Sequence, residues 1–213
     1  MKFQEFENKI VKITKLKLPG EVAHFKMAPI ERLAALKKIA IEKETVRKAG
    51  VLVLFYPSET NQTMLALILR KTYKGVHSAQ IGFPGGKYEN EDTSLKETAL
   101  RETEEEIGVL RNTVSVLKKL TEVYIPPSNF FVQPYLGITK NTPNFILQEE
   151  EVETLIEVPL IHFMDDTIKI HQNLTTSYAK NIIVPAFLLN NYLVWGATAM
   201  MLSEVREMLK ELL

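Results

Sequence analysis

Glutamates gather at the end of one stretch, GFPGGKYENEDTSLKETALRETEEEIGV, which spans residues 82–109. On a helix with about 100° per residue, Glu105 lies about 60° to one side of Glu102, and Glu106 lies about 40° to the other. Carboxylates near the C-terminal end of a helix oppose its dipole, and they repel one another at these spacings. The glutamates therefore destabilise this end of the helix, which indicates that they have a functional role.

Binding a cation would be such a role. Hard carboxylate oxygens suit Mg²⁺ or Mn²⁺ better than zinc. Such ions bridge protein carboxylates and substrate phosphates, and they lower the pKa of a bound water molecule. Glutamate runs are also common on exposed helices. The helical spacing alone therefore leaves a metal site and a solvated helix end both open.

The elements around the glutamates have clear local signals. Ser94 followed by Glu97 fits a capping box, which predicts a helix that begins near Leu95, and Gly108 fits the residue after its end. Glu97 can also pair with Arg101 one turn later. The face beside the glutamates is expected to pack on a sheet and carries Leu100, Thr103 and Ile107.

The glycine-rich turn before this helix, Gly82 to Gly86, can bring backbone N–H groups close to the same site. It is not a phosphate-binding P-loop, because tyrosine follows Lys87 and the glycine spacing differs.

The rest of the chain predicts strands in the middle with helices around them. Residues 28–50 indicate a helix, with Pro29 near its start and Gly50 past its end. Residues 51–57 and 63–70 indicate the two strands of a hairpin. Further strands are expected in 76–86, 114–126, 131–139, 154–163, 167–173 and 181–196, and a final helix in 198–213. The pattern predicts an α/β fold, a mixed sheet covered by helices.

The last helix carries apolar residues at helical spacing, namely Met201, Val205, Met208 and Leu212. We interpret this methionine-containing stripe as core packing rather than as a ligand groove.

Composition excludes several classes of protein. The chain has 213 residues, 46% of them hydrophobic and 24% charged, with a formal net charge of zero and no cysteine. Disulfides, Cys-ligated zinc and a thiol nucleophile are therefore excluded, and no charge excess favours nucleic acid. The first 18 residues contain no signal-peptide stretch, and no run approaches the roughly 20 apolar residues of a membrane span. These features predict a cytoplasmic protein.

Residues 101–109, RETEEEIGV, resemble the REUxEExGU core of the Nudix box, where U is a bulky apolar residue. Thr103 stands at the apolar position inside the box. The acidic residue expected between the glycine and the arginine is displaced by one, since Asp92 lies six residues after Gly86 and nine before Arg101.

That displacement is similar to the coenzyme A pyrophosphatase branch of the superfamily. The branch also has an arginine after an apolar strand, here Arg70, and a phrase close to HAGQVxFPGG, here HSAQIGFPGG from His77 to Gly86. Downstream, FFVQPYLGI, EEVETLIEVPL and LVWGATAMML resemble further phrases of the branch, so the likeness spans roughly residues 50–205.

The resemblance implies a Nudix fold, which is an α/β/α sandwich with a mixed sheet. It implies Mg²⁺- or Mn²⁺-dependent hydrolysis of the diphosphate of coenzyme A or its derivatives, giving 3′,5′-ADP and 4′-phosphopantetheine. Glu102 and Glu106 match the usual metal-ligand positions, with Glu105 beside them, and all three are predicted as metal ligands and as catalytic residues. A carboxylate from a later loop often assists, and Glu151 is our candidate, with Glu150 second.

The predicted substrate-binding residues are Arg70, His77, Gly85 and Gly86. A guanidinium suits a phosphate at Arg70, although a strand-end arginine can also pair with a surface glutamate. His77 is read as structural when it is considered alone. The aromatic residues of YIPPSNFF, residues 124–131, are read as packing, while this segment is also a plausible adenine-binding loop.

We expect one domain over residues 1–213, with an N-terminal helical extension over about 1–49 and a C-terminal helix over about 197–213. The expected partner is a small nucleotide rather than nucleic acid or membrane, and a homodimer stays open. Two alternatives remain. One is a Nudix enzyme for another nucleoside diphosphate, such as ADP-ribose or a dinucleotide, and the other is a non-catalytic Nudix-fold binding module.

Overall fold

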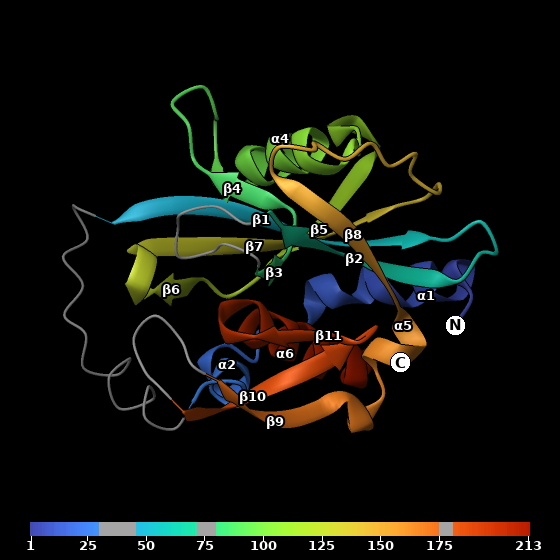
Figure 1. Ribbon diagram of the computed structural model, residues 1–213. Helices are drawn as coiled ribbons and strands as arrows, with labels where there is room; N and C mark the ends of the chain where they lie inside the picture. The colour runs from blue at the N-terminus through green and yellow to red at the C-terminus, as the bar shows by residue number, and fades with distance from the viewer. Residues whose placement is uncertain (30–45, 72–79, 175–180) are drawn as a thin grey trace.

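A large mixed sheet lies between two helical layers in the computed structural model, which describes residues 1–29, 46–71, 80–174 and 181–213. Figure 1 shows α4 on one side of this sheet and α1, α2 and α6 on the other, with a smaller sheet beside α6. The predicted mixed sheet covered by helices is confirmed.

The helices are α1 (Phe3–Ile10), α2 (Glu21–Phe25), α4 (Leu95–Ile107), α5 (Leu160–Phe163) and α6 (Gly196–Leu212). Short 3₁₀ turns are η1 (Val11–Lys15), η2 (Arg111–Thr113), η3 (Pro126–Ser128) and η4 (Asp166–Ile168). The strands are β1 (Arg47–Pro57), β2 (Thr63–Arg70), β3 (Ile81–Gly82), β4 (Gly85–Lys87), β5 (Val114–Lys119), β6 (Val123–Ile125), β7 (Phe130–Thr139), β8 (Val152–Pro159), β9 (Lys169–Leu174), β10 (Ile182–Leu189) and β11 (Tyr192–Trp195).

Strand β1 is the centre of the large sheet. It pairs antiparallel with β2 and β4 and parallel with β7. On one side, β8 pairs with β2; on the other side, β5 and β6 both pair with β7. Pairing of Phe55 with Leu65 confirms the predicted hairpin of β1 and β2. Strands β9, β10 and β11 form the smaller sheet.

Alternation along β1 separates two apolar cores. Leu52 and Leu54 pack in the cluster beneath α4, whereas Val53 and Phe55 pack in the cluster against α1 and α6, and all four are fully buried. On α6, Met201, Val205 and Met208 are buried in that second core, which confirms the stripe as packing.

The prediction that Gly50 follows the end of a helix was wrong. Gly50 lies inside β1, opposite Gly86 of β4. A Cβ at this position would lie 2.1 Å from the carbonyl oxygen of Leu95, so the glycine lets the start of α4 pack closely on the sheet. Most of the predicted helix, residues 30–45, lies outside the described residues.

Two other expectations changed in detail. Residues 160–163 form the short helix α5 rather than the end of a strand, because β8 stops at Pro159, whose fixed φ of −60° suits the residue before a helix. The glycine pair 85–86, expected in a turn, belongs to the short strand β4. None of the helices in the described ranges is long and apolar enough to span a membrane.

Candidate active site

Helix α4 carries the predicted carboxylates, and its boundaries agree with the local signals. The helix begins at Leu95, where the Ser94 hydroxyl accepts a hydrogen bond from the Glu97 N–H at 3.3 Å. It ends at Gly108, which has a φ of 74° in the left-handed region that favours glycine. The sequence-predicted capping and stop positions are therefore confirmed.

Glu106 is the most deeply placed of the three predicted ligands, with no exposed surface. One carboxylate oxygen accepts a hydrogen bond from Arg70 Nη1, and the other accepts one from the Gly85 N–H, both at 2.7 Å. Arg70 Nη2 also donates to the Gly85 carbonyl. The end of β2, the start of β4 and the last turn of α4 are thus joined at one carboxylate.

Burial is the main influence on the ionisation of the Glu106 carboxyl group. It raises the pKa of Glu106 from 4.5 to about 7, against the opposing effects of the Arg70 charge and the Gly85 N–H, while the nearby charge of Glu102 raises it further. Burial likewise raises the pKa of Glu102, with Arg101 opposing the shift and Glu105 and Glu151 adding to it. The two carboxylates are therefore electrostatically coupled and partly removed from water.

Glu102 lies over the glycine pair. A Cβ built on Gly86 would lie 2.3 Å from Glu102 Oε2, so only glycine leaves room for the carboxylate. The glycine-rich segment therefore positions both ligand candidates. The N–H of Gly85 binds the Glu106 carboxylate, and the absence of a side chain at Gly86 leaves space for the Glu102 carboxylate. This agrees with the predicted close approach of the backbone to the site.

Arg101 organises the outer side of the cluster, a role that the sequence reasoning missed. Its Nε and Nη2 donate to the two carboxylate oxygens of Asp92 at 2.9 Å and 3.0 Å, and its Nη1 lies 2.9 Å from Glu105 and 3.1 Å from Glu102. The predicted pairing of Arg101 with Glu97 is therefore wrong, and Glu97 pairs with Lys96 instead.

Asp92 fixes this arginine. Its carboxylate also accepts hydrogen bonds from the Thr98 hydroxyl and the Glu89 N–H. The hydrogen bonds from Arg101 are the main reason that the pKa of Asp92 lies well below its ordinary value. The signal in the sequence was the displaced acidic position. At that position Asp92 orients Arg101, since two guanidinium nitrogens bind its carboxylate in a fixed plane.

Glu105 differs from its neighbours, because about half of its side chain is exposed and it pairs with Arg101. In the described part of the chain, no three histidine, aspartate or glutamate side chains lie together as a ready metal cluster. Glu102 and Glu106 are the pair that the fold brings together, and Glu105 lies at the edge.

The loop before β8 brings Glu151 to the same site. The N–H of Gln148 donates to the Glu106 carbonyl at 3.0 Å, and the N–H of Lys71 donates to the Glu151 carbonyl at 2.8 Å. The charge of Glu151 also raises the pKa of Glu102. Glu150 is exposed and next to it in the chain. His77 lies outside the described residues, so its predicted role stays a prediction.

These donors suit a hard divalent cation. Burial raises the pKa of both Glu102 and Glu106, and the charge of Glu102 raises that of Glu106 further, so a cation between the two carboxylates would favour their ionised forms. Oxygen donors are what Mg²⁺ and Mn²⁺ prefer. Arg70 and Arg101 supply part of the compensating positive charge in this structure. The residues therefore fit the predicted metal in their chemistry.

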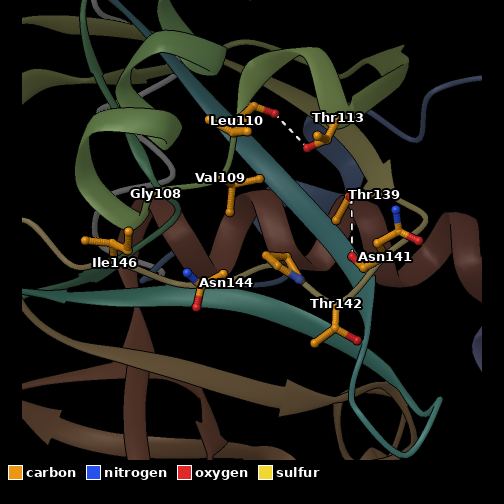
Figure 2. Close-up of a pocket in the computed structure, with 10 residues that line it drawn as sticks. Gly108, Val109, Leu110, Thr113, Thr139, Asn141, Thr142, Asn144 and Ile146 are labelled. Carbon is orange, nitrogen blue, oxygen red and sulfur yellow. Dashed lines mark hydrogen bonds between the residues drawn. The ribbon is translucent and has the colours of Figure 1, made fainter.

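A separate pocket of about 300 Å³ lies beyond the C-terminal end of α4. Figure 2 shows its lining, which includes Val109, Thr113, Asn141, Asn144 and Ile146. No residue of this lining is titratable, and none of the predicted carboxylates reaches it. It does not have the chemistry of the site on α4.

Comparison with known proteins decides the family. The model of the NUDIX domain matches residues 46–173, which is more than half of the chain. The chain belongs to the Nudix family. This Nudix protein is 34% identical over 161 residues to a Yersinia pestis protein named uncharacterized Nudix hydrolase NudL, covering 73% of this chain and 76% of that one.

A second relative is named for its activity. The peroxisomal coenzyme A diphosphatase ndx-8 of Caenorhabditis elegans is 26% identical over 174 residues, covering 81% of this chain and 73% of that protein. The prediction of a Nudix pyrophosphohydrolase is confirmed by the family and by relatives with such names.

Solved structures agree on the fold. The Nudix hydrolase RenU of M. smegmatis superposes with a TM-score of 0.53 at 14% identity, covering 78% of this chain and 87% of that chain. A MutT/nudix family protein of Enterococcus faecalis gives 0.51 at 16% identity, covering 86% and 70%. At these identities the likeness concerns the fold alone, and it confirms the predicted Nudix fold.

Proposed function

We propose that this Nudix hydrolase cleaves the diphosphate linkage of coenzyme A or its derivatives and requires Mg²⁺ or Mn²⁺. The observation that carries the proposal is the coupled pair Glu102 and Glu106, held against Gly85 and Gly86 next to Arg70. The sequence phrase around these glycines resembles the coenzyme A branch, and a 26% identical relative is named a coenzyme A diphosphatase.

Each residue has a defined task in this proposal. Glu102 and Glu106 hold the metal ion, and Glu105 lies where it can assist. When bound, the ion neutralises charge on the diphosphate and favours ionisation of a water molecule. Glu151, on the loop beside Glu102, accepts the proton of the attacking water as its oxygen forms a bond to phosphorus and the phosphoanhydride P–O bond breaks. The products are 3′,5′-ADP and 4′-phosphopantetheine.

Substrate binding falls to the groups that surround the carboxylates. Arg70, whose guanidinium already lies between Glu106 and the Gly85 carbonyl, binds a phosphate oxygen. The backbone of Gly85 and Gly86 borders the same place, and His77 stays a predicted contact. The single domain over residues 1–213 and the cytoplasmic location also stay predictions.

The test is a hydrolysis assay of purified protein with coenzyme A, ADP-ribose and a dinucleotide, with added Mg²⁺ or Mn²⁺ and with excess EDTA. We expect coenzyme A to be cleaved fastest and only with a divalent ion. Faster cleavage of ADP-ribose would contradict the substrate, and full turnover in EDTA would contradict the metal.

A matched pair of variants ties the activity to the site. Glu102→Gln should remove it, whereas Glu104→Gln should not, because Glu104 pairs with Arg111 away from the glycine pair. A non-catalytic Nudix-fold module would cleave none of the substrates with or without either change.

A further inference from the structure

Three neighbouring strands place a cation and two aromatic rings in one row beside the catalytic helix. Lys48 of β1 is opposite Phe131 of β7, and Phe131 is opposite Tyr124 of β6. Residues that are opposite each other on paired strands project from the same face of a sheet. The three side chains therefore form a continuous strip, here called the aromatic row.

The aromatic row lies on the same face as α4. Gly50 is two residues after Lys48 on β1, so both face the same side, and a Cβ on Gly50 would touch the backbone of α4. Gly86, opposite Gly50, lies beneath the Glu102 carboxylate. Two residues along a strand span roughly 7 Å and neighbouring strands lie about 4.8 Å apart, so the row begins roughly 8 Å from Gly86 at Lys48 and continues across β7 and β6 to roughly 16 Å at Tyr124.

The rings are held in position but are not fully covered. Tyr124 and Phe131 are both half-buried, with ring centroids 5.1 Å apart and planes at 47°. The Tyr124 hydroxyl donates to the side-chain oxygen of Asn129 at 2.9 Å, which fixes the tyrosine ring. Lys48 is exposed at the end of the row.

The neighbouring Phe130 shows the contrast. It faces the other side of the sheet, where it packs against the core, and the guanidinium of Arg47 lies 4.3 Å from its ring centroid. Of two adjacent phenylalanines, only Phe131 is therefore available on the face of the carboxylate site.

We propose that Phe131 and Tyr124 stack against the purine base of the substrate and that Lys48 binds a phosphate carried by that nucleoside. The inference rests on the proposed function, because it places the nucleoside of the cleaved diphosphate next to Glu102. Partly exposed aromatic rings stack on any base, since every base has a π face, and a nearby ammonium complements a phosphate. In this arrangement the enzyme binds the nucleotide half of coenzyme A rather than its pantetheine arm.

Calorimetric binding of each product to the Mg²⁺-loaded protein tests the proposal. Phe131→Leu keeps an apolar side chain but removes the π face, and it should weaken binding of 3′,5′-ADP by about tenfold. Binding of 4′-phosphopantetheine should change less than about twofold. Phe130→Leu is the matched control on the opposite face and should leave both affinities unchanged, with thermal unfolding measured for each variant.

Lys48 provides an independent test that does not depend on core packing. Lys48→Gln should weaken 3′,5′-ADP binding several-fold but leave AMP, which lacks the 3′-phosphate, nearly unaffected. Lys119→Gln, at an exposed position of β5, is the control for a general loss of positive charge.

Three results would overturn the proposal. These are equal nucleotide affinity in the wild type and Phe131→Leu, a loss confined to 4′-phosphopantetheine, and a wild type that binds no adenine nucleotide. A wild type that does not cleave coenzyme A, yet binds 3′,5′-ADP in a Phe131-dependent manner, would refute only the proposed substrate and would support the aromatic row.

Discussion

The carboxylate of Glu102 occupies the space that a side chain at position 86 would fill. A Cβ on Gly86 would lie 2.3 Å from Oε2 and 2.4 Å from the carboxyl carbon of Glu102. The atoms in the way are at the end of the flexible Glu102 side chain. A larger residue at position 86 therefore fits only if the Glu102 carboxylate moves.

Gly86→Ala should therefore harm activity much more than stability. The carboxylate has to shift by an ångström or more, and misplacement on this scale can lower the rate by about a hundredfold. Hydrolysis rates and thermal unfolding of the purified variant measure the two effects.

Gly82→Ala is the control for this substitution. A Cβ at Gly82 would meet its nearest neighbours, Arg70 and Thr198, at 4.0 Å, which is an ordinary contact. We expect near-normal activity and stability. Equal loss of activity in both variants would mean that the segment tolerates no side chain at all, and the relationship between Gly86 and Glu102 would lose its special role.

Local signals explain why α4 was predictable. The Ser94 cap, the stop at Gly108 and the apolar spacing act within a few residues, so the sequence contains them directly. The shared face of the glutamates followed from helix geometry alone. The Nudix fold and family followed from the resemblance.

Contacts between distant residues explain what was not predictable. The sequence around Gly50 predicts a helix stop, because a glycine needed for close packing looks the same in sequence as a glycine that ends a helix. Helical spacing predicts a pair of Arg101 with Glu97, whereas the observed partner, Asp92, lies before the helix and offers two oxygens to the guanidinium. The contact of Arg70 with Glu106 joins residues 36 positions apart.

Glu151→Gln should lower kcat more than it raises KM. A group that accepts the proton of the attacking water acts in the transition state, so its loss appears in kcat. Glu150→Gln is the natural control, since the neighbouring residue has the same charge and is also exposed. An unchanged kcat for Glu151→Gln with a lowered kcat for Glu150→Gln would assign the task to Glu150.

Glu204, far from the site, should contribute to acid sensitivity. This buried carboxylate of α6 accepts hydrogen bonds from the N–H groups of Gly20 and Thr121, and it lies 3.4 Å from His24 Nε2. Burial raises its pKa, but the nearby His24 imidazole and the hydrogen bonds from Thr121 outweigh burial, and the net shift is downward. A lowered folded-state pKa stabilises the protein above the unfolded value near 4.5, and this stabilisation is lost as pH falls below it.

Glu204→Gln should cost about 3 kcal/mol at pH 7, because an amide nitrogen would face N–H donors in the core. Its stability should also fall less steeply than that of the wild type between about pH 5 and pH 3. Denaturant unfolding across this range measures both. Glu207→Gln, on the same helix but partly exposed and paired with Lys26, should cost less than about 1 kcal/mol. Parallel acid profiles for the wild type and Glu204→Gln would contradict the assignment.

Glu102→Gln should nearly abolish turnover and yet leave the metal-free protein as stable as before, or more stable. Burial already raises the pKa of Glu102, which means that its charged form is disfavoured in the fold. The neutral variant removes the repulsion from Glu105 and Glu106, each worth a few tenths of a kcal/mol, and Gln has nearly the same helix propensity as Glu. Arg101 loses one contact but keeps Asp92 and Glu105.

The cost of Glu102→Gln falls on catalysis instead, because a divalent ion loses an anionic ligand. A loss of about 3 kcal/mol in transition-state stabilisation would slow the reaction by more than a hundredfold. The measurement is thermal unfolding of both proteins in EDTA and again with Mg²⁺, beside their activities. The wild type should gain stability from Mg²⁺, and the variant should gain less, since an ion stabilises a fold in proportion to its binding. A variant that is clearly less stable in EDTA would make the glutamate cluster structural, and near-normal activity would remove α4 from the proposed mechanism.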